Sequence, residues 1–179
     1  KTGEVLTTSG LRFESVNGKR FYVNHRGSQG SQGSSLTSKG RAALGKRFRW
    51  GGGPVINGSQ NINATMGMMA SEDNTTIQVF GYDPSIVFRK GSLYNGITDD
   101  SYSITLNKGE SFVFEYPIYE SSIYTSTKVY DEWLGASIVS DKDIVVSIGN
   151  AMYAPIDGGG RDIAIDQIIP ENVLGSDYV

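Results

Sequence analysis

Three segments of the chain combine apolar positions and short polar interruptions in the same way. Residues 134–150 hold two apolar runs on either side of the polar tetrad Ser140-Asp141-Lys142-Asp143. Residues 64–80 and 102–116 repeat this arrangement, with apolar side chains alternating on both sides of a polar turn. An apolar period of two places these side chains on one face of a β-strand. We therefore predict three antiparallel β-hairpins whose apolar faces share a core.

These hairpins predict an all-β fold, an antiparallel β-sandwich of jelly-roll-like form. The 23 glycines and the modest apolar content of 38% favour short strands joined by glycine-containing turns over a helical bundle. We expect at most one short helix, near residues 37–45, capped by Thr37 or Ser38 and stopped by Gly45.

The two ends of the chain differ from its middle. We predict that residues 1–35 hold a hairpin, in which 11–16 pair with 20–24 around Asn17-Gly18, followed by a flexible Gly/Ser/Gln loop at 27–35. Residues 36–179 are then the β-sandwich module, which we expect to be truncated at its C-terminal end. The isoleucines of residues 161–170 fit a short strand or a single helical turn, and the pattern leaves both open.

Charge and composition exclude several classes of protein. A net charge of −3 argues against nucleic acid as the main partner, and no apolar run is long enough to span a membrane. The basic cluster within residues 39–49 is interpreted as a solvated, charge-balanced surface, with Leu44, Phe48 and Trp50 turned inward. The absence of Cys excludes disulfides and thiol nucleophiles, and a single histidine, His25, excludes His-rich metal sites.

No catalytic constellation emerges from the remaining polar residues, so we predict that the chain is not an enzyme. The neighbours Ser38 and Lys39 are uninformative among so many serines. Paired carboxylates of a glycosidase are the other route to catalysis, and we interpret them here as solubilising charge. The candidate pairs are Glu110 with Glu115, and Asp131 with Glu132.

No cofactor is expected, with a structural calcium ion as the alternative. Calcium takes several carboxylate and carbonyl oxygens, which acidic loops supply. The loops in question hold Asp99-Asp100 and the pair formed by Asp157 and Asp162.

The aromatic-rich connection at residues 116–133 is a candidate contact surface, because Tyr and Trp offer large amphipathic areas to sugars or proteins. The alternative is that half of these rings fill the core beneath the loop, and both interpretations stay open. The candidate contact residues are Tyr119, Tyr124, Tyr130, Trp133 and, beyond this loop, Tyr153.

Several segments resemble the N-terminal-like domain of IgGFc-binding proteins, and most closely the versions found in very large, type IX-secreted, gliding-motility-associated surface proteins of bacteria. The resemblance covers most of the chain from about Phe21 onward. The phrases GASIVSDKDIVVSIGN and DQIIPENVLGSDYV are the most specific. The matching segments are residues 39–52, 68–84, 104–115, 135–150 and 162–179.

This resemblance implies a non-enzymatic module of a secreted adhesin that is displayed on the bacterial cell surface and used in gliding motility and surface attachment. The implied partners are the substratum, glycans or other cell-envelope proteins, the secretion and motility machinery of the outer membrane, and further domains of a long chain. A carbohydrate-binding module or a glycoside-active domain is the alternative, and a structural spacer without a ligand is a third interpretation.

Overall fold

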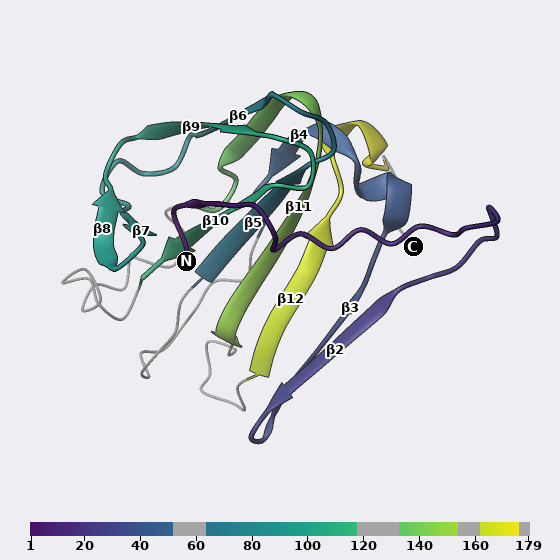
Figure 1. Cartoon of the computed structure of the whole chain (residues 1–179). Coiled ribbons are helices and arrows are strands. Elements are labelled where there is room, and N and C mark those ends of the chain that lie inside the picture. The colour runs from purple at the N-terminus through teal and green to yellow at the C-terminus, as the bar shows by residue number, and fades with distance from the viewer. Residues whose placement is uncertain (52–63, 118–132, 154–161, 176–179) are drawn as a thin grey trace.

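The computed structural model describes residues 1–51, 64–117, 133–153 and 162–175. In this part of the chain the regular elements are antiparallel strands and two short 3-10 turns, with no α-helix (Figure 1). This confirms the predicted all-β class, and the arrangement is consistent with a β-sandwich. The elements are β1 (Val5–Leu6), β2 (Asn24–Gln29), β3 (Gln32–Thr37), η1 (Gly40–Ala43), β4 (Gly45–Arg49), β5 (Ala64–Ala70), β6 (Thr75–Phe80), β7 (Phe88–Lys90), β8 (Leu93–Ile97), β9 (Ser101–Leu106), β10 (Ser111–Tyr116), β11 (Ser137–Tyr153), β12 (Asp162–Ile168) and η3 (Glu171–Val173).

The strand β11 connects the two layers of the molecule. It runs for 17 residues and its pairing changes along its length. Residues 137–140 pair with β6, and β4 lies on their other side. From residue 144 onward β11 pairs with β5, and from Val146 onward also with β12, while Ile144 keeps one last pair with Gly45 of β4. One layer is therefore β9-β6-β11-β4, and the other is β1-β10-β5-β11-β12.

The prediction of a hairpin at residues 134–150 is wrong, because the polar tetrad at residues 140–143 lies within the continuous strand β11. The pairing register with β4 shifts between Val139 and Ile144. The polar side chains serve neighbouring segments: the Asp141 carboxylate accepts a hydrogen bond from the Thr76 amide at 2.8 Å, and the Lys142 ammonium donates one to the Asp73 carbonyl. Since both halves of the strand already have partners, the chain bends here instead of folding back on itself.

The other two predicted hairpins have the expected strands and turns but not the expected pairing. β5 and β6 follow one another in the chain, yet β5 pairs with β10 and β11 while β6 pairs with β9 and β11. β9 and β10 are separated in the same manner. Each turn therefore carries the chain from one layer to the other.

The two turns and the bend of β11 meet at one corner of the molecule. The Ser71 amide donates to the Asp143 carbonyl at 3.2 Å, and the Gly109 amide donates to the Ala70 carbonyl at 2.9 Å. The Asn74 amide donates to the Asn107 side chain at 3.2 Å. Three polar segments that are distant in sequence thus satisfy one another's backbone groups, which stabilises the change of layer.

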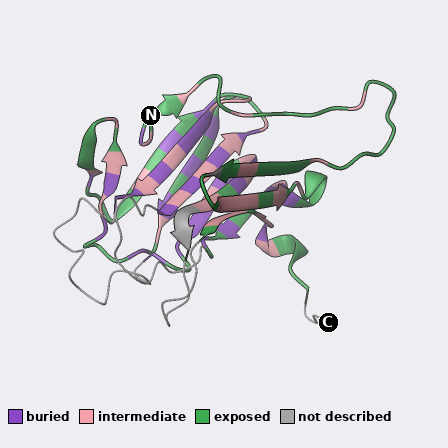
Figure 2. Ribbon diagram, turned by 90° about the horizontal axis from the view of Figure 1, so that it is seen from below, coloured by how far each residue is buried: buried purple, intermediate pink, exposed green. Residues whose placement is uncertain are grey.

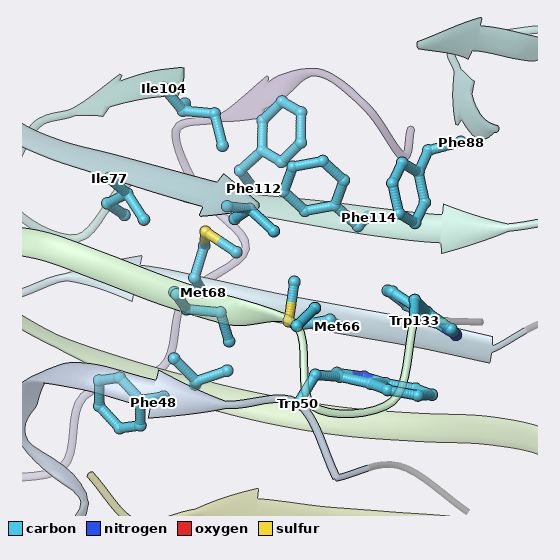
Figure 3. Close-up of a cluster of buried hydrophobic side chains, with 14 of the residues drawn as sticks. Phe48, Trp50, Met66, Met68, Ile77, Phe88, Ile104, Phe112, Phe114 and Trp133 are labelled. Carbon is cyan, nitrogen blue, oxygen red and sulfur yellow. The ribbon is translucent and has the colours of Figure 1, made fainter. Parts of the chain in front are cut away.

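The core lies between the two layers, as the alternation predicts. Met66 and Met68 of β5 face Ile77 of β6, and all three side chains are at most 1% exposed. Phe114 of β10 and other aromatic rings extend this core toward its far end (Figure 3). Phe48 and Trp50 are also buried, which confirms that they turn inward.

The N-terminal region departs from both predictions made for it. Residues 11–16 and 20–24 do not pair as strands, although the Gly18 amide does close a turn onto the Ser15 carbonyl. Residues 27–35, predicted to be a flexible loop, lie instead in the β2–β3 hairpin. This hairpin lies beside β12, where the Gly33 amide donates to the Asp162 carboxylate at 2.6 Å. Contacts from a distant strand hold a segment that has no apolar anchor of its own.

The predicted helix near residues 37–45 is a single 3-10 turn, η1, after which β4 begins at Gly45. Residues 161–170, left open between strand and helix, contain β12. β1 pairs with β10, which joins the first residues of the predicted N-terminal segment to the sandwich. Over the described ranges, the structure contains no helix of the length and apolar character needed to cross a membrane.

Candidate functional site

Trp133, a predicted contact residue, lies in the core. Its side chain is 1% exposed and its ring stacks on Trp50, with a centroid distance of 3.9 Å and an interplanar angle of 26° (Figure 3). Phe88 and Tyr116 pack against the same ring, at 5.2 and 6.3 Å. Trp133 is therefore corrected to a core residue, which agrees with the alternative that some of these rings fill the core.

The other predicted contact residues cannot be placed beside Trp133. Tyr119, Tyr124 and Tyr130 lie outside the described residues, as does the side chain of Tyr153. Tyr116, which precedes the first of these loops, pairs with Ala64 at one end of the sandwich, and Ala64 pairs on its other side with Asn150, three positions before Tyr153. A contact surface at this end stays a prediction.

The carboxylates proposed for a glycosidase do not converge. Glu110 precedes β10 and accepts a hydrogen bond from the Asn107 amide at 2.8 Å, so it stabilises a turn. Glu115 lies near the other end of β10, five positions on, where its carboxylate accepts from Thr2 and pairs with Arg89. Five positions of extended strand span about 17 Å, whereas catalytic carboxylates stand about 5–9.5 Å apart. Asp131 and Glu132, the second pair, lie outside the described residues.

The remaining candidates for nucleophilic catalysis have structural partners. The Lys39 ammonium forms an ion pair with Asp166 at 2.9 Å. The Ser38 hydroxyl contacts Gln167 at 3.3 Å rather than a base. His25 lies exposed on β2, opposite Leu36.

Of the acidic residues considered for calcium, Asp99, Asp100 and Asp162 lie in the described part of the chain. Within residues 1–51, 64–117, 133–153 and 162–175, no three His, Cys, Asp or Glu side chains are placed to hold a metal ion. One oxygen of Asp162 accepts hydrogen bonds from the Gly33 and Ile163 amides. Asp99 and Asp100 lie beside Tyr82, and Asp157 is outside the described residues.

A groove lies beneath the N-terminal arm, by which we mean residues 10–23. The arm leaves the sandwich, turns at residues 16–17 and returns to β2, and Figure 2 shows it exposed along most of its length. The space between the arm and the body of the protein measures about 810 Å³. Met69 and Val145, paired across β5 and β11, belong to its lining, together with Leu44.

The groove is basic although the whole chain carries a net charge of −3. Its lining includes one acidic residue, Glu14, which forms an exposed ion pair with Arg12 at 2.9 Å. The basic residues in the lining are Arg12, Lys19, Lys39, Arg41 and Lys108. The Lys39 ammonium is paired with Asp166, whereas the side chains of Lys19, Arg41 and Lys108 form no ion pair in the described part of the chain. The Lys108 backbone amide donates to the Asp73 carboxylate at 3.0 Å.

Sequence reasoning missed this groove. The interpretation of residues 39–49 as a charge-balanced surface agrees with the structure for Arg47 and Arg49, which both pair with Glu171. It does not describe Arg41, which faces the groove. The signal in the sequence was the combination of basic and apolar residues at 11–22. The predicted hairpin used the backbone and apolar side chains of this segment for pairing within itself, so no binding surface was expected there.

Comparison with known proteins relates the chain to one family. The family model described as IgGFc binding protein matches residues 33–179, which include every strand from β4 to β12. The N-terminal arm precedes the matched region. No curated protein and no solved structure matches the chain.

Proposed function

Because the chain belongs to the IgGFc binding protein family, we propose that it is a non-enzymatic binding module of a secreted adhesin, displayed on a bacterial cell surface and used in gliding motility and attachment. The observation that carries the proposal is the family match over residues 33–179. A binding role agrees with the separation of Glu110 from Glu115, which leaves this pair unable to act on one glycosidic bond.

The proposed partners are the substratum, glycans or other proteins of the cell envelope. The secretion and motility machinery of the outer membrane and neighbouring domains of a long parent chain would position the module. The bacterial setting rests on the segments at residues 39–52, 68–84 and 135–150, which resemble gliding-motility surface proteins. The family's name adds the Fc region of immunoglobulin G as a ligand to be tried.

The experiment is replacement of residues 33–179 in the parent protein by an unrelated β-sandwich of similar size. Cells carrying the replacement should still export the protein but attach and glide less well. A matched control carries the single exposed change Lys90→Glu in the native module. Unchanged attachment and gliding after the replacement would contradict the adhesin role.

The purified chain tests the non-enzymatic part of the proposal. It should bind without releasing product when it is applied to a glycan array, to immobilised Fc and to envelope proteins. Hydrolysis of any glycan, reduced by Glu110→Gln, would instead identify a glycoside-active domain. Binding of neutral glycans alone would identify a carbohydrate-binding module.

A further inference from the structure

We propose that the groove beneath the N-terminal arm binds an extended, acidic peptide segment of a partner protein, which adds to the arm as a β-strand. The inference rests on the proposed function as a binding module and names the partner's chemistry. Three properties of the described residues carry it: the unpaired backbone of the arm, its exposed apolar side chains and the uncompensated positive charge of the groove.

The arm offers backbone groups that have no strand partner within the described residues. Its backbone hydrogen bonds are the turn from Gly18 to Ser15 and the bond from Ser38 to the Val23 carbonyl where the arm returns. Residues 11–14 and 19–22 therefore present free amides and carbonyls along two legs. Such groups pair readily with an extended peptide, which is how many domains recognise their partners.

The arm also exposes an unusual amount of apolar surface. Of the eleven exposed large hydrophobic side chains in the described residues, five belong to residues 11–22. Leu11 and Phe13 are 77% and 58% exposed, and their spacing of two places both on one side of an extended chain. Exposed apolar patches of this kind mark interaction sites on soluble proteins.

The charge of the groove selects an acidic partner. The side chains of Lys19, Arg41 and Lys108 line it without an ion pair among the described residues, while the single acidic residue of the lining, Glu14, is already paired with Arg12. Carboxylates of a partner would complement these cations and accelerate encounter. A peptide is favoured over an acidic glycan because an extended peptide presents amides and carbonyls alternately at the spacing of a strand, which complements both the free carbonyls and the free amides of the arm.

The test measures binding of a fluorescent random copolymer of glutamate and tyrosine to the intact chain. Binding should weaken by about tenfold or more as sodium chloride rises from about 50 to about 500 mM, because the contact is between exposed charges. Hydrogen exchange of the amides at residues 11–14 and 19–22 should slow on binding, which simple charge attraction would not produce.

Matched substitutions locate the site. Arg41→Glu in the groove should weaken binding by about tenfold, whereas Lys90→Glu on β7 makes the same change of charge outside the groove and should leave binding within about twofold. Phe13→Ser on the arm should also weaken binding, while Leu93→Ser on β8 removes an equally exposed apolar side chain and should not. All four side chains are exposed, so circular dichroism should show folded protein in each case.

Several results would overturn the inference. These are no binding, equal losses in both members of a matched pair, or unchanged exchange at the arm. Heparin that binds as tightly, with the same dependence on Arg41, would reassign the groove to acidic glycans. A concentration-dependent dimer that Phe13→Ser dissolves would assign the arm to a second copy of the chain. The adhesin role fails separately, through unchanged attachment when residues 33–179 are replaced in the parent protein.

Discussion

At the scale of single residues, the space around a side chain and its burial decide which substitutions a position accepts without loss of stability. Gly45 begins β4 where Pro170 lies against it, and a Cβ atom at this position would stand 2.4 Å from the Pro170 ring. Tyr82 shows the same principle for a polar side chain, because its buried ring keeps a hydroxyl that donates to the Asp99 carbonyl at 2.8 Å. Such positions contribute stability through contacts that local sequence does not reveal.

Replacing Gly45 by alanine should destabilise the protein by about 1–3 kcal/mol, because the new methyl group forces β4 and Pro170 apart. Urea unfolding of the two chains measures the difference in the free energy of unfolding. Gly51→Ala is the control, since a Cβ atom there meets nothing within 4 Å in the part of the chain that the structure describes, and its effect should stay within about 0.5 kcal/mol. Equal effects of the two changes would show that β4 does not approach Pro170 closely.

The titration of Tyr82 should make the protein less stable in base. Burial, followed by the negative charges of Asp99 and Asp100, raises the pKa of Tyr82 from 10.0 to about 12. The fold thus favours the neutral phenol: its contribution is complete below about pH 10 and is lost as the pH rises to about 12. The loss amounts to about 2 kcal/mol, measured as the change in the urea midpoint across this range.

Tyr82→Phe is the control for this pH dependence. Without an ionisable group at position 82, the decline between about pH 10 and 12 should be shallower than in the parent chain. Parallel curves for the two proteins would mean that other groups cause the decline.

At the scale of elements, two turns and the bend of β11 cross between layers at a shared corner. The turn of a hairpin is stabilised by hydrogen bonds within its own segment. These segments instead stabilise one another, for example through the hydrogen bond from the Ser71 amide to the Asp143 carbonyl. The bend of β11 belongs to this corner, and its acidic and basic side chains bind backbone groups of other segments. The corner is therefore a cooperative unit, in which a change at one of these three segments affects the other two.

The double substitution Asp141→Asn and Lys142→Gly distinguishes a bend inside β11 from a hairpin turn. Asn-Gly stabilises two-residue hairpins, so it would be neutral or favourable if residues 134–150 folded back on themselves. Within a continuous strand it removes the Lys142 bond to Asp73 and adds a flexible glycine. We expect a loss of about 2 kcal/mol in the free energy of unfolding.

Lys108→Asn is the matched control, because it places the same dipeptide in the turn at residues 107–110, where Gly109 already has a φ of 83°. Its effect should remain within about 0.5 kcal/mol. Stabilisation by the double substitution would restore the hairpin interpretation of β11.

At the scale of the whole molecule, a β-sandwich with one core carries two additions from its N-terminal region, the arm and the β2–β3 hairpin. The arm holds much of the exposed apolar surface, and positive charge gathers beneath it on a chain that is acidic as a whole. The hairpin lies beside β12, with Asp162 and Gln167 receiving hydrogen bonds from its side. The family match begins at residue 33, inside β3, so the arm and β2 lie outside it.

The contact between the β2–β3 hairpin and β12 should open independently of the core. Gln167→Ala removes the acceptor of the Lys39 amide, at 2.7 Å, and of the Ser38 hydroxyl, at 3.3 Å. Hydrogen exchange at residues 32–39 should rise by about tenfold, while the global unfolding midpoint shifts little, because the core is untouched. Gln78→Ala on the exposed face of β6 is the control and should leave this exchange unchanged.

The sequence by itself determined which side chains face the core. Alternation at residues 75–80 and 111–116 depends only on the pleat of a strand, so it predicted the buried faces of β6 and β10 and the all-β class. The inward direction of Phe48 and Trp50 followed from their apolar character alone.

Only the tertiary structure decided which strands pair and what the groove contains. Backbone hydrogen bonds are the same for every residue type, so β11 could not be distinguished in sequence from a hairpin whose halves bind each other. The docking of residues 27–35 onto β12 and the burial of Trp133 against Trp50 likewise depend on partners far along the chain. The groove joins the arm to Met69, Lys108 and Val145, and that proximity exists only after the layers have formed.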